Sequence, residues 1–217
     1  MITDVQIANM ALALVKEQSI TKLISTGAAA TAVGVGYEVV LRETLEDKAS
    51  WEFLRFRAQL SRLADSDGYI APTSGGWLYQ YKLPANCLRI LETIDENGDK
   101  INYPSSREVY VNGAITTDVL LSNQEFCFVR FLVNRTNPND WPAWFTKLFY
   151  HRLAMVISGP LTKDDQRYNQ LAVWTMRAYN EALAANSMES TEVNDHYTDV
   201  DNGSDLININ RGYSGIS

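Results

Sequence analysis

The 217-residue sequence has only two cysteines and two histidines, and neither pair points to a familiar site. Cys87 and Cys127 lie far apart inside apolar stretches, so we expect two buried, reduced thiols rather than a disulfide framework. His151 falls on the polar side of an aromatic helical pattern, where a solvated or interface histidine is expected. His196 has no cysteine or second histidine nearby. The sequence therefore predicts no metal site.

Signatures of catalysis and of cofactor binding are also lacking. No Gly-x-Ser-x-Gly elbow occurs, and no Gly-Lys-Ser or Gly-Lys-Thr follows the glycines. Gly34-Val35-Gly36 begins like a dinucleotide fingerprint, but Val39 stands where the third glycine belongs. Two acidic clusters, at 65–68 and 199–203, lack the glutamate that completes a calcium loop. We expect no cofactor and no enzyme, although paired carboxylates for glycan hydrolysis depend on the fold and stay open.

Basic residues are in the minority, with 19 against 26 acidic ones, which gives a net charge of −7. We therefore do not expect the wrapping of nucleic acid through its phosphates to be the main role. No apolar segment approaches the roughly 20 residues that a membrane span requires. The hydrophobic share of 46% is nevertheless enough to bury a core.

Hydrophobic periodicity predicts helices at both ends of the chain. Apolar residues recur at helical spacing over residues 3–18 and again over 37–48, separated by a small-residue run at 27–36 that suits close packing or a flexible turn. A strong aromatic stripe runs from Asp140 to Gly159-Pro160, which should end that helix. Thr162 and Asp165 resemble a capping box for a further helix to about Ser187.

The middle of the chain, residues 51–133, reads as an antiparallel β region. Tyr79, Tyr81 and Leu83 alternate with polar residues, and residues 126–133 form an almost wholly apolar strand. Two dipeptides, Asn97-Gly98 and Asn112-Gly113, suit hairpin turns because both turn positions favour positive φ. The segment near Phe56 fits either a strand or a helix.

Residues 189–217 are acidic and polar. Six carboxylates against one arginine give this segment −5 of the chain's net charge of −7. It cannot form its own core, so we expect an arm that is disordered in the free chain. The expected fold class is therefore α+β: a helical bundle made by the N-terminal and C-terminal helices (about 3–48 and 140–187), an inserted antiparallel β region, and an extended C-terminal arm.

A succession of short motifs resembles one protein family. In order they are Trp51-Glu52-Phe53, the run from Trp77 to Arg89 (WLYQYKLPANCLR), Thr116-Thr117-Asp118, the helix start from Trp141 to Phe145 (WPAWF), and Pro160-Leu161-Thr162. Their order and spacing over residues 37–187 resemble the tail tubular protein A family, the head-to-tail adaptor or gatekeeper ring of short-tailed bacteriophages.

The resemblance implies a structural protein of the virion tail, assembled in the bacterial host cytoplasm. Residues 1–188 would form the adaptor domain, and twelve copies would form a ring between the portal protein and the tail nozzle. The DNA genome would pass through the ring without specific binding, which an acidic channel favours by repelling phosphates. No membrane is involved.

Two surfaces are expected to contact partners. The arm alternates apolar and polar residues at 206–210, so it could add a strand to the portal; the contact residues would be Leu206, Ile207, Ile209, Arg211 and Tyr213. The hairpin tips at Asn97, Gly98, Asn112 and Gly113 would face the nozzle. The alternatives are a virion-associated glycan hydrolase and a carbohydrate-binding tail module with exposed aromatic residues.

Overall fold

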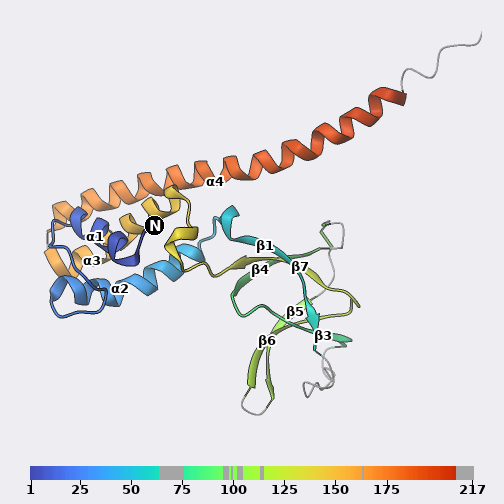
Figure 1. The fold of residues 1–217 in the computed structure, drawn as a ribbon, viewed down its shortest axis with the longest axis horizontal. Helices are drawn as coiled ribbons and strands as arrows, with labels where there is room; N and C mark the ends of the chain where they lie inside the picture. The colour runs from blue at the N-terminus through green and yellow to red at the C-terminus, as the bar shows by residue number, and fades with distance from the viewer. Residues whose placement is uncertain are drawn as a thin grey trace, which may run out of the picture. The chain divides into compact units, whose positions relative to one another are not determined.

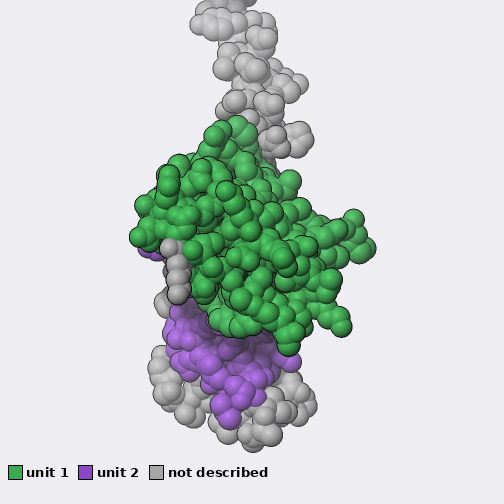
Figure 2. Space-filling model, turned by 90° about the vertical axis from the view of Figure 1, so that its left-hand side faces the viewer, with its two compact units in different colours: residues 1–41, 141–217 green, residues 42–140 purple. Residues whose placement is uncertain are grey.

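The computed structural model describes residues 1–63, 76–94, 98, 100–101, 105–112, 115–162 and 164–208 (Figure 1). The chain divides into two compact units, coloured separately in Figure 2. Unit 1 is helical and joins residues 1–41 to 141–217, whereas unit 2 comprises residues 42–140 and is built on β-strands. The predicted α+β class, with helices from both chain ends and an antiparallel β insertion, is confirmed.

The helical unit is organised around α3 (Ala143–Thr162). Helix α1 (Asp4–Leu14) begins with a capping box in which Thr3 and Gln6 satisfy each other's backbone amides. Helices α2 (Ala28–Leu45) and α4 (Asp165–Asn208) complete the unit, although α2 runs on into unit 2. The six most buried apolar residues of α3 have 0–1% of their surface exposed: Phe145, Leu148, Phe149, Leu153, Ala154 and Ile157.

Helices α2 and α4 pack against opposite faces of α3. On one face, the hydroxyl of Thr175 in α4 donates to the carbonyl oxygen of His151 at 3.2 Å. On the other, the rings of Tyr37 in α2 and Phe149 meet edge to face, with centroids 5.1 Å apart. With about 100° between successive residues of a helix, His151 and Phe149 lie on nearly opposite sides of α3. The unit is therefore layered, with α3 between α2 and α4 (Figure 1).

Helix boundaries differ from the sequence-based expectation at three points. Of the two interpretations of the small-residue run, close packing is confirmed and the flexible turn is not: α2 begins at Ala28 and contains residues 28–36, and Gly36 lies against α3. Pro160 lies inside the last turn of α3, where it removes a single amide donor; nearby, the hydroxyl of Thr162 donates to the carbonyl oxygen of Ser158 at 3.0 Å. The N-cap of α4 is Asp164, whose carboxylate accepts from the amide of Arg167, so the predicted capping box at Thr162 and Asp165 is wrong.

Unit 2 contains two antiparallel sheets. The three-stranded sheet has the order β1-β7-β4, with β1 Arg55–Gln59, β7 Phe128–Val133 and β4 Cys87–Ile94. The four-stranded sheet has the order β2-β3-β6-β5, with β2 Ser61–Arg62, β3 Tyr79–Lys82, β6 Ile115–Ser122 and β5 Ser105–Asn112. Short 3-10 turns, η1 Glu52–Leu54 and η3 Pro138–Asp140, lie at the two ends of the unit. The ambiguous segment near Phe56 is thus a strand.

The core of unit 2 is anchored by Tyr81, which is almost wholly buried. Its hydroxyl lies 2.5 Å from the carbonyl oxygen of Gln124 and 2.7 Å from that of Glu125, so it holds the loop before β7. Burial raises the pKa of this hydroxyl to about 12. The buried cluster around it consists of Leu60, Leu83, Leu120, Cys127, Val129, Phe131 and Val133. Both cysteines are free; Cys127 is buried as expected, whereas Cys87 is only partly buried.

Gly36 marks the close approach of α2 to α3. A Cβ at this position would lie 3.6 Å from side-chain carbons of Leu153, Val156 and Ile157, which is an ordinary contact distance. Gly36→Ala is therefore expected to raise the free energy of unfolding by about 0.5–1 kcal/mol, because alanine loses less backbone entropy in a helix. Urea denaturation followed by circular dichroism measures the change.

Gly34→Ala is the matched control. Its Cβ would lie 3.3 Å from the carbonyl oxygen of Leu23, a tighter approach to a backbone atom, so its gain should be smaller. A Gly36→Ala chain that is less stable than Gly34→Ala would contradict this packing of α2 on α3.

Candidate interaction surfaces

The described residues contain no group of three or more histidine, cysteine or acidic side chains arranged to hold a metal ion. Nor does any helix in the described ranges combine the length and apolar character that a bilayer crossing requires. The surface features that stand out are instead exposed apolar side chains on α2, α4 and β5. These surfaces are the candidates for contact with other proteins.

The predicted arm is helical where the structure describes it. Helix α4 does not end near Ser187 but continues to Asn208, so Leu206 and Ile207 lie on a helix and not on an extended segment. Once a helix is nucleated each added residue gains a hydrogen bond, and residues 188–202 contain no glycine or proline to stop it. The strand that residues 206–210 would add to a portal concerns the bound state, and it stays a prediction. Ile209, Arg211 and Tyr213 lie outside the described residues.

The predicted hairpin tips are described only in part. Strands β5 and β6 form a hairpin, so the predicted chain reversal in this region is present. Asn112, however, is the last residue of β5 and pairs with Ile115, so it is not one of the two turn positions as predicted. Gly98 has a φ of +95°, as the turn chemistry requires, and follows the end of β4. Asn97 and Gly113 lie outside the described residues.

Polar and aromatic contacts hold α4 against α3. Glu181 accepts from the ammonium of Lys147 at 2.5 Å and from the guanidinium of Arg177 at 3.1 Å. The hydrogen bond from Lys147 is the main reason that the pKa of Glu181 lies below its usual value. At the start of α3, the indole nitrogen of Trp144 donates to Glu189 at 3.1 Å. These contacts fix which face of α4 points outward.

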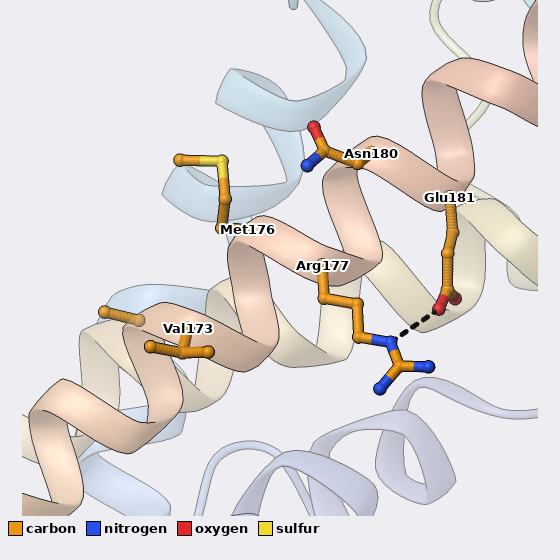
Figure 3. A pocket seen from close by; sticks show the side chains of 6 residues that line it. Val173, Met176, Arg177, Asn180 and Glu181 are labelled. Atoms are coloured by element: carbon orange, nitrogen blue, oxygen red, sulfur yellow. Dashed lines mark hydrogen bonds and ion pairs between the residues drawn. The ribbon is translucent and has the colours of Figure 1, made fainter.

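The outward face of α4 is apolar over two turns. Val173 and Met176 expose 69% and 61% of their surface, and we call this pair the α4 stripe. Figure 3 shows the two side chains on successive turns, with Asn180 beyond them and the Arg177–Glu181 ion pair at their side. An open hollow of about 610 Å³ lies here, lined by residues of α4 alone. A hollow formed by a single helix is a surface for contact with another molecule, and not an enclosed site for a small ligand.

The outward face of α2 carries a second, different stripe. Val35 and Val39 expose 73% and 56% of their surface and lie one helical turn apart; we call this pair the α2 stripe. Ala28, Thr31 and Ala32 continue the same face toward the N-terminus of α2. The inner face of α2, with Val33, Tyr37, Val40 and Leu41, is buried, so the exposed valines are not needed for the fold of the unit.

Strand β5 provides a third exposed surface, in unit 2. It lies at the edge of the four-stranded sheet, and Val109 and Val111 expose 59% and 61% of their surface. On the same face, Arg107 forms an ion pair with Asp118 of β6 at 2.8 Å. An edge strand of this kind can accept a further strand.

The exposed valines and Met176 were not singled out from the sequence. Their signal is present, since each pair recurs at helical or strand spacing, but apolar periodicity alone does not say which stripe is covered. No model of a known protein family matches this chain, and no curated protein matches it.

His151 corrects the expectation of a solvated histidine. Only 9% of its surface is exposed, and its Nδ1 has no hydrogen-bond partner among the described residues. Burial, and then the charge of Lys147, lower the pKa of His151, while Glu181 opposes the shift. The backbone of the same residue contacts α4, since its carbonyl oxygen accepts from the hydroxyl of Thr175.

The stability of the chain is expected to fall as the pH drops below about 6.5, the pKa of histidine in an unfolded chain. Because the folded pKa of His151 is lower, the unfolded chain binds the proton more tightly in this range. The contribution of His151 to the free energy of unfolding is therefore fully present above pH 6.5. It is lost as the pH falls toward the pKa that His151 has in the folded chain. Urea denaturation between pH 7.5 and 5 measures it.

His151→Gln should reduce the difference in the free energy of unfolding between pH 7.5 and pH 5. Lys147→Gln is the control, since it removes the smaller cause and leaves burial in place, so most of the pH dependence should remain. If the free energy of unfolding depended on pH in the same way in the wild type and in His151→Gln, the His151 imidazole would not contribute to the pH dependence.

Proposed function

We propose that this protein is a structural head-to-tail adaptor, a subunit of a ring between a phage portal and the tail nozzle, through which the DNA genome passes. The observation that supports the proposal best is that several residues of the family motifs are buried in the cores of the two units: Trp51, Tyr81 and Leu83 in unit 2, and Trp141 and Phe145 in unit 1. A resemblance carried by surface residues would say little about fold, whereas core residues in the expected order support a shared architecture.

In unit 2, two of the motifs provide fixed internal contacts. Trp51 is fully buried, and its indole nitrogen donates to the carbonyl oxygen of Thr44, in the last turn of α2, at 2.7 Å. This bond satisfies one of the carbonyl groups that a helix end leaves open. Tyr81, from the second motif, holds the loop before β7 as described above.

In unit 1, the motif from Trp141 to Phe145 starts α3 and packs its first turns. The ring centroid of Trp141 lies 5.3 Å from that of Phe145 and 5.4 Å from that of Phe149, in edge-to-face contacts. Pro142 immediately precedes the helix, where its missing amide costs nothing. The motif thus has a structural role in this chain.

The charge of the chain suits a conduit for DNA. A net charge of −7 per subunit is multiplied by the number of copies in a ring, and repulsion of phosphates keeps the polyanion from adhering. This argument supports passage without specific binding.

The ring itself is tested by electron microscopy and analytical ultracentrifugation of the full chain, alone and mixed with portal rings of the same phage. We expect ring-shaped particles, or a complex of the chain with portal rings. A chain that stays monomeric with portal present would contradict the proposal.

The arm is tested separately by deleting residues 203–217. We expect loss of co-sedimentation with portal rings and an unchanged circular dichroism melting temperature of the β unit and bundle. The reason is that the Trp144–Glu189 contact between α3 and α4 lies well before the deleted residues. Unchanged portal binding would remove the arm from the portal contact.

A further inference from the structure

The two apolar stripes of the helical unit differ in chemistry and point in opposite directions. The α2 stripe and the α4 stripe lie on the outer faces of helices that pack on opposite sides of α3. On α4 the buried residues Leu171, Ala178 and Ala182 face α3, so Val173 and Met176, about half a turn away in phase, face outward. The unit therefore has two separate apolar surfaces and not one.

We propose that the α4 stripe of one copy packs against the α2 stripe of a second copy, head to tail. The inference rests on the proposed function and names the contact that would close the ring. A two-fold dimer cannot satisfy both stripes at once, because an isologous contact uses the same surface of both copies, and these surfaces lie on opposite sides of one unit. Each added copy covers one stripe and exposes the next.

The two stripes suit each other as partners. The α2 stripe is a ridge of rigid, β-branched valines beside small residues, whereas Met176 is flexible and can fill the space around such a ridge. Charged side chains lie at both rims, with exposed Glu38 beside Val39 and the guanidinium of Arg177, mostly exposed although it pairs with Glu181, beside Met176, so that Glu38 of one copy can face Arg177 of the next. A contact of this kind places apolar side chains at the centre and opposite charges at the edge.

The test uses two variants of the full chain, each blocked on one side. Val35→Lys/Val39→Lys places charges on the α2 stripe, and Val173→Lys/Met176→Lys places them on the α4 stripe. All four side chains are mainly exposed within the subunit, and lysine is a good helix former, so both variants should fold with the wild-type melting temperature. A buried, unpaired charge should weaken self-association by about 100-fold or more.

We expect each variant alone to stay monomeric under conditions where the wild type assembles. An equimolar mixture should give a one-to-one dimer and nothing larger, because only one intact α2 stripe and one intact α4 stripe can meet. Sedimentation velocity and mass photometry distinguish the monomer, dimer and ring. Val109→Lys/Val111→Lys is the matched control, with two equally exposed valines replaced on β5, and it should assemble like the wild type.

Several results would overturn the contact and leave the proposed function intact. One is a wild-type ring that both blocked variants still form; another is a pair of variants that lose assembly but never form the mixed dimer. Variants that form rings but no longer bind portal rings would assign the stripes to the portal. A wild-type chain that is monomeric even with portal present would overturn the ring and the contact together.

Discussion

The burial of α3 on two opposite faces is the constraint on which the helical unit depends. A helix with apolar side chains on both faces must be covered from both sides, or it leaves a large apolar surface in water. Truncating a buried leucine or phenylalanine to alanine in such a core typically costs about 2–5 kcal/mol. In this chain the covers come from both sides of the β unit in the sequence, since α1 and α2 precede it and α4 follows it. The fold of the bundle thus brings the N-terminal and C-terminal helices together around α3.

The core of the β unit is formed by short strands and not by long helices. Its two sheets are held by buried apolar residues and by a few polar side chains that reach backbone groups, such as Tyr81 and Trp51. Each of these side chains satisfies a carbonyl oxygen outside the regular ladders, and a buried carbonyl without a partner costs about 1–3 kcal/mol. The aromatic residues of unit 2 therefore contribute hydrogen bonds as well as apolar surface.

Much of this architecture could be predicted from the sequence, because period and turn chemistry are local signals. The strand at Tyr79–Lys82, the hairpin after Asn112 and the aromatic helix after Trp141 all follow from such patterns. The ends of the helices were predicted less well than the helices themselves. Pro160 was expected to end a helix, but it lies in the last turn, where few hydrogen bonds remain to be lost.

The candidate surfaces were harder to predict. His151 lies on the polar side of its helical pattern and Val173 is apolar, yet His151 is buried and Val173 is exposed. The reason is that α4 covers one face of α3, whereas nothing within the helical unit covers the outer face of α4. A pattern of side chains gives the phase of a helix, but the identity of the buried face depends on which helices pack together. Only the three-dimensional arrangement shows that α2 and α4 each keep an apolar stripe outside.

The layered helical unit also bears on how many copies a head-to-tail assembly contains. In such an assembly, the rotation from one copy to the next is set by the angle between the two contact surfaces, and the chain closes into a ring only if that rotation divides a full turn. Here both surfaces are attached to α3, through contacts at Gly36 on one side and at Thr175 on the other. In the proposed assembly, the angle between the two contact surfaces would therefore depend on interior residues that touch no neighbouring copy. A change at the α2–α3 or α3–α4 seam would alter this angle, and with it the number of copies in the proposed ring, without changing the residues of the contact itself.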